Sequence, residues 1–293
     1  MRRVAVIGST GQLGTDVVRV LTEAGAYRVS PLNHGQIECT DPGSVRKALA
    51  EVSPEVVINC VAFVRVDECE DRPEEAFQVN TLGGLYVARA CVELNALCVY
   101  ISTDYVFDGE KGEAYTEDDP PCPINVYGTS KLAGEHLVRQ ACPRWLIVRV
   151  ASLFGKAGAR GKGGNFVETI LAKAQSRQPL RVVNDIYMSP TYTHDAARAL
   201  EQLLQQGATG LFHLTNAGAC TWYEFAHKAL HLVGLDDLLE PVTSQDYPSR
   251  ALRPRDSSLR STRLDAFIRE CLRPWQEALK AYFVEKDYRD GKP

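Results

Sequence analysis

Apolar residues in the first half of the chain alternate between short runs of strand length and stretches of helical spacing. The strand-length runs lie at residues 4–7, 27–32, 56–62, 97–101 and 145–150. Apolar residues at three- and four-residue intervals predict helices around 17–21, 42–52, 85–94 and 127–137. This regular alternation predicts right-handed βαβ crossovers, and therefore an α/β fold with a Rossmann-type, doubly wound parallel sheet.

The second half of the chain has shorter elements and more loops. Helical spacing recurs at about 166–174, 195–204 and 222–232, and short strands are predicted near 180–183 and 211–214. The change of pattern predicts two units, which are residues 1–150 with the sheet and residues 151–293 as a smaller, mixed C-terminal domain. We expect about 180–213 to return to the first unit.

The composition mainly excludes partners. Among 293 residues, 33 basic and 37 acidic side chains leave a net charge of −4, with no broad basic face for nucleic acid. The apolar run near Met1 is too short for a signal peptide or a membrane span, which predicts a cytoplasmic protein without a membrane partner. Nine cysteines, never spaced as Cys-x-x-Cys, indicate neither a disulfide framework nor a structural zinc site, and no metal ligands are predicted.

A glycine-rich turn joins the first predicted strand to the first helix. Its spacing is Gly8-x-x-Gly11-x-x-Gly14, which lets the backbone approach a pyrophosphate at a helix N-terminus. A tight turn also selects glycine, so the strand-to-helix context carries the prediction of a dinucleotide site. The second strand ends near Asn33 and His34, where an acidic residue would have indicated NAD. The choice between NADPH and NADH stays open, with a lean to NADPH.

A tyrosine and a lysine share one face of a later helix. Tyr127 and Lys131 are four residues apart, and a nearby ammonium favours an ionised phenol, so we expect Lys131 to lower the pKa of Tyr127. Such a phenol can pass a proton to a carbonyl oxygen while hydride arrives at the carbon. Thr103 follows the strand 97–101, where ligands bind in doubly wound sheets, and could hold that carbonyl. The alternatives are a helix without a catalytic role and a threonine that satisfies local backbone groups.

Charged clusters elsewhere in the chain have both functional and structural interpretations. One surrounds Pro254 and suits phosphate binding, although surface arginines are common; it consists of Arg250, Arg253 and Arg255. The loop 155–164 could close over an anionic substrate or be only a mobile surface loop; its basic residues are Lys156, Arg160 and Lys162. The acidic tract 67–75 could line the site or form a solvated loop and helix start.

Taken together, these motifs resemble the extended short-chain dehydrogenase/reductase family and, within it, the dTDP-4-dehydrorhamnose reductases. The resemblance covers nearly the whole chain and rests on Gly8-x-x-Gly11-x-x-Gly14, 62–67, 79–80, Ser102 to Gly109, Tyr127 to Glu135, 164–166, 189–191, 221–223 and 253–254. It implies that residues 1–150 are an NAD(P)-binding domain and that 151–293 mainly bind a sugar nucleotide.

The resemblance also implies a reaction, which is NAD(P)H-dependent reduction of the C4 ketone of dTDP-4-dehydro-L-rhamnose to dTDP-L-rhamnose. The implied catalytic group is Thr103, Tyr127 and Lys131, with Lys131 bonding the nicotinamide ribose. The implied cofactor contacts are Gly8, Thr10, Gly11, Gln12 and Leu13 at the turn, Glu38 and Cys39 near adenine, and Ala62, Phe63, Tyr127 and Lys131 near nicotinamide. The implied substrate contacts are Thr103, Asp104, Tyr127, Ser152, Asn165 and Arg253. Mg²⁺ is implied by the resemblance alone. The expected assembly is a monomer or a homodimer.

Two positions depart from the family pattern on the sugar-binding side. Ser152 stands where many members carry tryptophan, and Met188 stands where they carry glycine. Another nucleotide-linked 4-keto-6-deoxyhexose is therefore an alternative substrate. The chain also resembles the regulatory β subunit of methionine adenosyltransferase, which binds NADP without needing turnover, so a regulatory subunit is the alternative of a different class.

Overall fold

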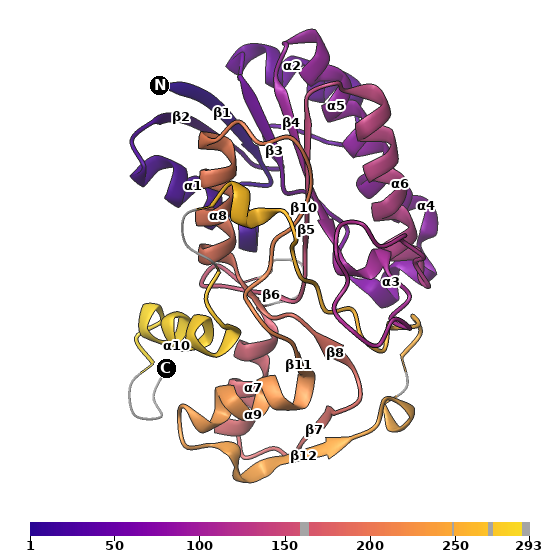
Figure 1. Ribbon diagram of the computed structural model, residues 1–293, viewed down its shortest axis with the longest axis vertical. Coiled ribbons are helices and arrows are strands. Elements are labelled where there is room, and N and C mark those ends of the chain that lie inside the picture. Colours follow the sequence, from indigo (N-terminus) through magenta and orange to yellow (C-terminus); the bar gives the residue numbers. More distant parts are fainter. Residues whose placement is uncertain (159–163, 248, 269–271, 289–293) are drawn as a thin grey trace.

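The computed structural model describes residues 1–158, 164–247, 249–268 and 272–288, and Figure 1 shows a helix-flanked sheet joined to a smaller, mostly helical part. The first part contains β1 (Arg2–Ile7), α1 (Gln12–Glu23), β2 (Tyr27–Leu32), α2 (Pro42–Val52), β3 (Val56–Asn59), α3 (Val66–Asp71), α4 (Pro73–Phe77), η1 (Gln78–Leu82), α5 (Gly83–Glu93), β4 (Leu97–Thr103), η2 (Asp104–Val106), α6 (Val126–Ala141) and β5 (Trp145–Val150). The later elements are β6 (Leu153–Phe154), α7 (Phe166–Gln175), β7 (Leu180–Val183), β8 (Tyr187–Met188), β9 (Thr191–Tyr192), α8 (Thr193–Gln205), β10 (Gly210–His213), β11 (Cys220–Thr221), α9 (Trp222–His231), η4 (Asp236–Leu238), β12 (Leu239–Val242), η5 (Ser244–Asp246), η6 (Leu264–Ala266) and α10 (Trp275–Glu285).

Six strands form one parallel sheet in the order β2-β1-β3-β4-β5-β10. The chain adds β2 on one side of β1 and then continues with β3 on the other side, so the strand order reverses between β1 and β3. Ligands of doubly wound sheets bind at the carboxyl ends of the strands beside such a reversal. The predicted α/β, Rossmann-type fold is therefore confirmed, and its ligand edge coincides with the glycine turn that follows β1.

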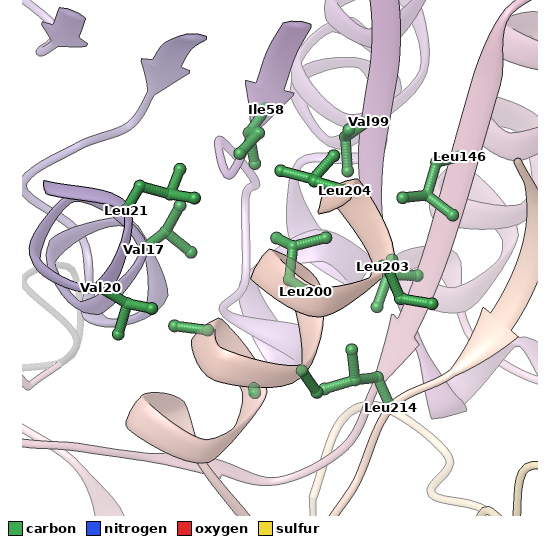
Figure 2. Packing of buried hydrophobic residues seen from close by; sticks show 14 of the residues in the cluster. Val17, Val20, Leu21, Ile58, Val99, Leu146, Leu200, Leu203, Leu204 and Leu214 are labelled. Carbon is green, nitrogen blue, oxygen red and sulfur yellow. The ribbon is translucent and has the colours of Figure 1, made fainter. Parts of the chain in front are cut away.

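Alternating side chains divide the core of the sheet into two layers. Val4 and Val6 of β1 pack in the layer that includes α1 and α8, whereas Ala5 and Ile7 pack in the layer that includes α2, α5 and α6. Figure 2 shows the first layer, with Val17, Leu21, Leu200 and Leu203 of the helices near Ile58, Val99 and Leu146 of the strands. Because helices cover both faces, the strands are apolar along their whole length, which explains the continuous apolar runs of the sequence.

The smaller part has an aromatic core under α7, α9 and α10. The rings of Phe154 and Tyr192 stack at 5.5 Å, and Phe225 and Tyr282 pack against Phe154 from α9 and α10. Three two-stranded sheets among the described residues complete this part, namely β6 with β9, β7 with β12 and β8 with β11. The helix α9 begins at a capping box, in which the side chains of Thr221 and Glu224 bond to each other's backbone N–H groups.

The segment 180–213 is divided between the two parts. The strand β7 pairs with β12 in the smaller part, so the expectation that the chain returns from about residue 180 is wrong for this strand. The return begins at α8, which packs on α1, and continues with β10, which pairs with β5 in the central sheet. The apolar pattern of a four-residue strand does not specify its partner, because both sheets bury such a strand. The division into domains at residue 150 stays a prediction.

Local side chains explain where some elements end. The predicted strand 56–62 stops at Asn59, whose side-chain oxygen accepts a hydrogen bond from the N–H of Val61 at 3.1 Å and so turns the chain. The segment 117–123 contains no regular helix or strand, as its prolines predict.

Other predictions concern what the chain contains besides its elements. Arg160 and Lys162 of the predicted basic loop lie outside the described residues, as does Cys271. None of the eight described cysteines is part of a disulfide. In the part of the chain that the structure describes, no helix combines the length and the apolar character needed to cross a bilayer.

Candidate active site

The glycine turn fits closely against its neighbours. Gly8 has a φ of +74°, which favours glycine, and its N–H donates to the carbonyl of Leu32 at the end of β2. A Cβ on Gly14 would lie 2.2 Å from the carbonyl oxygen of Gly8, so no larger residue fits there. Within the described chain, no side chain caps α1 at Gly11, and the N–H groups of its first turn remain available to a ligand. This arrangement suits a pyrophosphate.

A groove of about 650 Å³ runs from this turn along the end of β2. Its lining includes four of the predicted cofactor residues, namely Gly8, Thr10, Glu38 and Cys39. Gln12 lies at the adjoining helix start, and its buried side-chain oxygen lacks a hydrogen-bond partner among the described residues. An unpaired buried oxygen beside a groove is consistent with a ligand that donates a hydrogen bond. Leu13 contributes through its backbone, since its side chain packs in the core.

The two predicted adenine residues differ in what they offer. The carboxylate of Glu38 accepts hydrogen bonds from the N–H and hydroxyl of Thr40, and these bonds lower its pKa. Cys39 is buried, and burial raises the pKa of its thiol to about 12. Glu38 is therefore a charged acceptor at the groove, whereas Cys39 is an apolar part of its wall.

The start of α6 brings Tyr127 against the end of β4. Asn125 caps this helix by accepting a hydrogen bond from the N–H of Gly128 at 2.7 Å. A Cβ on Gly128 would lie 2.0 Å from the carbonyl oxygen of Tyr105, so the helix start and η2 are in close contact. The Tyr105 and Tyr127 rings meet edge to face at 6.0 Å, and the Thr103 hydroxyl is a hydrogen-bonding partner of the Tyr127 phenol. The structure thus brings together two of the three predicted catalytic side chains.

Lys131 lies one turn further along the same face of α6. Its ammonium donates to the carbonyl of Ile101 at 2.6 Å and lies 4.2 Å from the centre of the Tyr100 ring. The side chain is 1% exposed, and burial lowers its pKa to about 7, against the opposing attraction of Glu135. This lysine is a buried cation that can lose its proton near neutral pH.

The surroundings of Tyr127 do not give the lowered pKa that was expected from Lys131. Burial raises the pKa of Tyr127, and this outweighs the hydrogen bond with Thr103, which acts in the other direction. The charge of Asp104 raises it further. The expectation of a more acidic phenol is therefore wrong for this arrangement, because its surroundings desolvate the phenolate.

Asp104 is more enclosed than a sugar contact requires. It is 3% exposed, and its two oxygens already accept hydrogen bonds from Thr103 at 3.0 Å and from Ser257 at 2.6 Å. The sequence provided no signal for Ser257, which lies 153 positions further along the chain.

The loop after β3 is held to α6 by Asn80. The side-chain oxygen of Asn80 accepts from the N–H of Phe63 at 2.8 Å, and its amide nitrogen donates to the hydroxyl of Ser130 at 2.9 Å. This contact fixes the loop that contains Ala62 and Phe63, the predicted nicotinamide contacts. The sequence analysis did not assign Asn80 this role.

The arginine cluster lines a second groove, of about 1270 Å³, between the sheet and the smaller part. Arg253 forms two hydrogen bonds to the carboxylate of Asp67, at 3.2 and 2.8 Å, and Arg250 pairs with Asp71. The acidic tract therefore forms two helices, and Asp67 and Asp71 lie in the wall of this groove. Arg253 lines this groove, and its guanidinium is already paired; its contact with a substrate stays a prediction.

Two predicted substrate residues, Asn165 and Ser152, form their hydrogen bonds in the described structure with groups other than Thr103 and Tyr127. Asn165 caps α7 by accepting from the N–H of Glu168, and its amide donates to the carbonyl of Gly155. Ser152 has a φ of +41° in the turn after β5, and its carbonyl accepts from the N–H of Thr191. Met188 was expected at the sugar-binding side, but it is buried in the core of the smaller part. An asparagine before a helical run is also a capping signal, which the sequence analysis did not weigh.

A buried ion pair lies behind the catalytic strands. Arg149 of β5 binds both oxygens of Glu135 on α6 at 2.8 and 2.7 Å, and Ser102 of β4 donates to the same carboxylate. Both charged side chains are 3% exposed. Among the described residues, no cluster of three or more His, Cys, Asp or Glu side chains could hold a metal ion.

A doubly wound sheet with a phosphate-binding glycine turn, and with Tyr-x-x-x-Lys beside a strand-end threonine, defines the class of short-chain dehydrogenase/reductase folds. The chain belongs to the RmlD substrate binding domain family, whose profile matches residues 1–287. It is 39% identical over 287 residues to the spore coat polysaccharide biosynthesis protein SpsK of Bacillus subtilis, covering 98% of each chain. It is 38% identical to the dTDP-4-dehydrorhamnose reductase of Streptomyces griseus, covering 98% of this chain and 95% of that relative. The fold matches the dTDP-4-dehydrorhamnose reductase of Bacillus anthracis in complex with NADP, with a TM-score of 0.91, 34% identity, and 97% and 100% coverage.

Proposed function

We propose that this protein reduces the C4 ketone of dTDP-4-dehydro-L-rhamnose to dTDP-L-rhamnose with NADPH or NADH. The observation that carries the proposal is the contact between the Thr103 hydroxyl and the Tyr127 phenol, at the carboxyl edge of the sheet and one helical turn from the buried ammonium of Lys131. Similarity over nearly the whole chain to a reductase of that name supports the substrate class.

The cofactor site fits the groove at the glycine turn. The first-turn N–H groups of α1 would donate to the pyrophosphate, the side-chain oxygen of Gln12 would accept from a donor group of the cofactor, and Glu38 would accept a hydrogen bond from the adenine end. When bound, the nicotinamide supplies the hydride that adds to C4 of the sugar. The relative in complex with NADP supports a nicotinamide cofactor, and the choice between NADPH and NADH is left to measurement.

The side chains near β4 handle the proton. Tyr127 donates its phenolic proton to the C4 oxygen as the hydride adds, and Thr103 fixes the position of the phenol. Lys131 would hold the ribose next to the nicotinamide through its buried ammonium. The groove that Arg253 lines is large enough for the nucleotide part of the substrate.

The test is reduction of dTDP-4-dehydro-L-rhamnose, followed through the absorbance of NADPH and of NADH. Tyr127→Phe should lower kcat by about 10²–10⁴-fold, the usual range for loss of a general acid, with little change in cofactor affinity. The control is Tyr187→Phe, which changes a tyrosine that is 42% exposed on β8. Near-normal reduction by Tyr127→Phe would assign the proton to another group. Cofactor binding by the wild type without any oxidation would instead support the regulatory-subunit alternative.

A second candidate is reduction of another nucleotide-linked 4-keto-6-deoxyhexose. It is favoured by Ser152, which stands where related chains carry a sugar-contacting tryptophan, and by the relative that is named only for spore coat polysaccharide biosynthesis. Comparing kcat/KM for several nucleotide-linked 4-keto sugars decides between the two candidates. We also infer a cytoplasmic site of action and a monomer or homodimer; light scattering with and without Mg²⁺ tests the assembly.

A further inference from the structure

A chain of hydrogen bonds leads away from Tyr127 into the protein. Tyr127 contacts the Thr103 hydroxyl, Thr103 donates to one oxygen of Asp104 at 3.0 Å, and Ser257 donates to the other oxygen at 2.6 Å. Thr103, Asp104 and Ser257 are all buried. Residues buried this deeply are usually connected for a reason of stability or of proton chemistry.

The protonation state of Asp104 determines the direction of these bonds. An ionised carboxylate only accepts, so it takes the single proton of the Thr103 hydroxyl, and the Thr103 oxygen can then only accept from Tyr127. Thr103 also accepts from the N–H of Tyr105 at 3.2 Å. When Asp104 carries a proton, it can donate to Thr103, and Thr103 is free to donate to Tyr127. The chain can therefore carry a proton from Asp104 to Tyr127.

We propose that Asp104 returns to Tyr127, through Thr103, the proton that the ketone consumes, and that Ser257 positions Asp104 for this transfer. The inference rests on the proposed reduction. The hydride forms the C4–H bond, and Tyr127 gives its proton to the C4 oxygen. Thr103 then gives its proton to the phenolate and takes the proton of the Asp104 carboxyl, which becomes a carboxylate. Solvent restores the Asp104 proton through the same chain after the product leaves.

The surroundings of Asp104 allow it to hold a proton near neutral pH. Burial raises its pKa to about 6, although the hydrogen bonds from Ser257 and Thr103 lower it. The groups that face it are these two hydroxyls, the N–H of Tyr105 and the phenols of Tyr105 and Tyr127. Arg253 bonds to the phenol of Tyr105 and is itself paired with Asp67.

Ser257 also connects the chain of hydrogen bonds to the substrate groove. The preceding residues Arg250 to Arg253 and Arg255 line that groove. Asn125, which caps the helix of Tyr127, donates to the carbonyl of Leu252 at 2.9 Å. One segment thus contacts the groove, the start of α6 and Asp104, and Ser257 is its contact with the proton path.

The experiment measures kcat and KM from pH 5 to pH 9 for the wild type, Ser257→Ala, Asp104→Asn and the control Ser258→Ala. Wild-type kcat should fall as pH rises above about 6, since the proton on Asp104 is lost. Ser257→Ala removes a hydrogen bond that favours the carboxylate, so the fall in kcat should move upward by about one pH unit. The kcat below about pH 6 should be lower than in the wild type, because Asp104 loses its positioning contact. Ser258→Ala should follow the wild type.

Asp104→Asn should lower kcat by about 10-fold or more and abolish the fall with pH, while the substrate KM stays within about twofold. Should Asp104→Asn fail to fold, the Ser257→Ala profile decides alone. Coincident profiles for the wild type and Ser257→Ala, or a loss in Ser257→Ala that is equal at every pH, would overturn the proton path. A wild type that reduces none of the sugars would refute the proposed function instead, which keeps the two failures separate.

Discussion

The two grooves of the molecule are built in different ways. The groove at the glycine turn is formed by the ends of β1 and β2 and by the loops that follow them, so most of its lining comes from within the first eighty residues. The walls of the groove between the two parts are joined by side-chain pairs that are distant in the sequence. Arg250 lies 179 positions from Asp71, and Arg253 lies 186 positions from Asp67. The first groove is specified by local geometry, and the second depends on correct folding of both parts.

The first prediction compares a buried ion pair beside the sheet with an exposed ion pair in the smaller part. Glu135→Ala leaves Arg149 buried without its partner and should destabilise the protein by about 3–5 kcal/mol. The matched change in the smaller part is Asp237→Ala, which breaks the exposed pair with Arg177 and should cost within about 0.5 kcal/mol. Urea unfolding of both variants measures the difference. Equal losses would show that the environment of the pair does not set its energy.

A second prediction tests the close fit of the glycine turn. Gly14→Ala places a Cβ against the backbone of Gly8, which cannot move aside, and should weaken cofactor binding by about 100-fold. Gly43→Ala in α2 is the control, because its Cβ would meet only the flexible side chain of Asp41 at 3.3 Å. Fluorescence titration with NADH and NADPH gives both affinities. An unchanged affinity in Gly14→Ala would remove the turn from the cofactor site.

A third prediction uses the lowered pKa of Lys131. Its pKa of about 7 in the folded protein lies below the 10.5 of an exposed lysine, so the unfolded chain binds more protons between these values. The free energy of unfolding of the wild type therefore increases as the pH rises through this range. Lys131→Met lacks this contribution. The free energy of unfolding of this variant minus that of the wild type should therefore be greatest at or below pH 7 and should fall by about 2 kcal/mol toward pH 9. Thermal unfolding at several pH values measures the trend.

The control for this trend is Lys173→Met on α7, because the ammonium of Lys173 is exposed to water in the folded protein as well. Its difference from the wild type should not change with pH. A constant difference for Lys131→Met would mean that Lys131 keeps its proton throughout the range.

The smallest expected effect concerns the second groove. If Arg253 binds the diphosphate of the substrate, Arg253→Ala should raise the substrate KM by about 10-fold and leave the cofactor KM unchanged. Asp67→Asn frees the guanidinium from its carboxylate partner and should lower the substrate KM. In that case, steady-state kinetics should show that the substrate KM rises in Arg253→Ala and falls in Asp67→Asn. Changes of the same sign would make the Arg253 and Asp67 pair a structural contact of the groove wall.

Local patterns along the chain were enough to predict the main elements of the first part and their order. Apolar runs and helical spacing specify β1 to β5 and the helices α1, α2, α5 and α6, because each of these elements buries its own pattern. The short helices between β3 and α5 were not predicted in this way. The strand-to-helix glycine turn and the four-residue spacing of Tyr127 and Lys131 depend only on local geometry. These features could be predicted without knowing the partners of any residue.

The surroundings of the candidate catalytic side chains could be known only after the chain was folded. It paired β7 with β12, raised the pKa of Tyr127 by burial, bound Lys131 to the carbonyl of Ile101 and joined Ser257 to Asp104. The physical reason is that pairing, burial and desolvation depend on groups that are distant in the sequence, whereas spacing along one helix or turn does not.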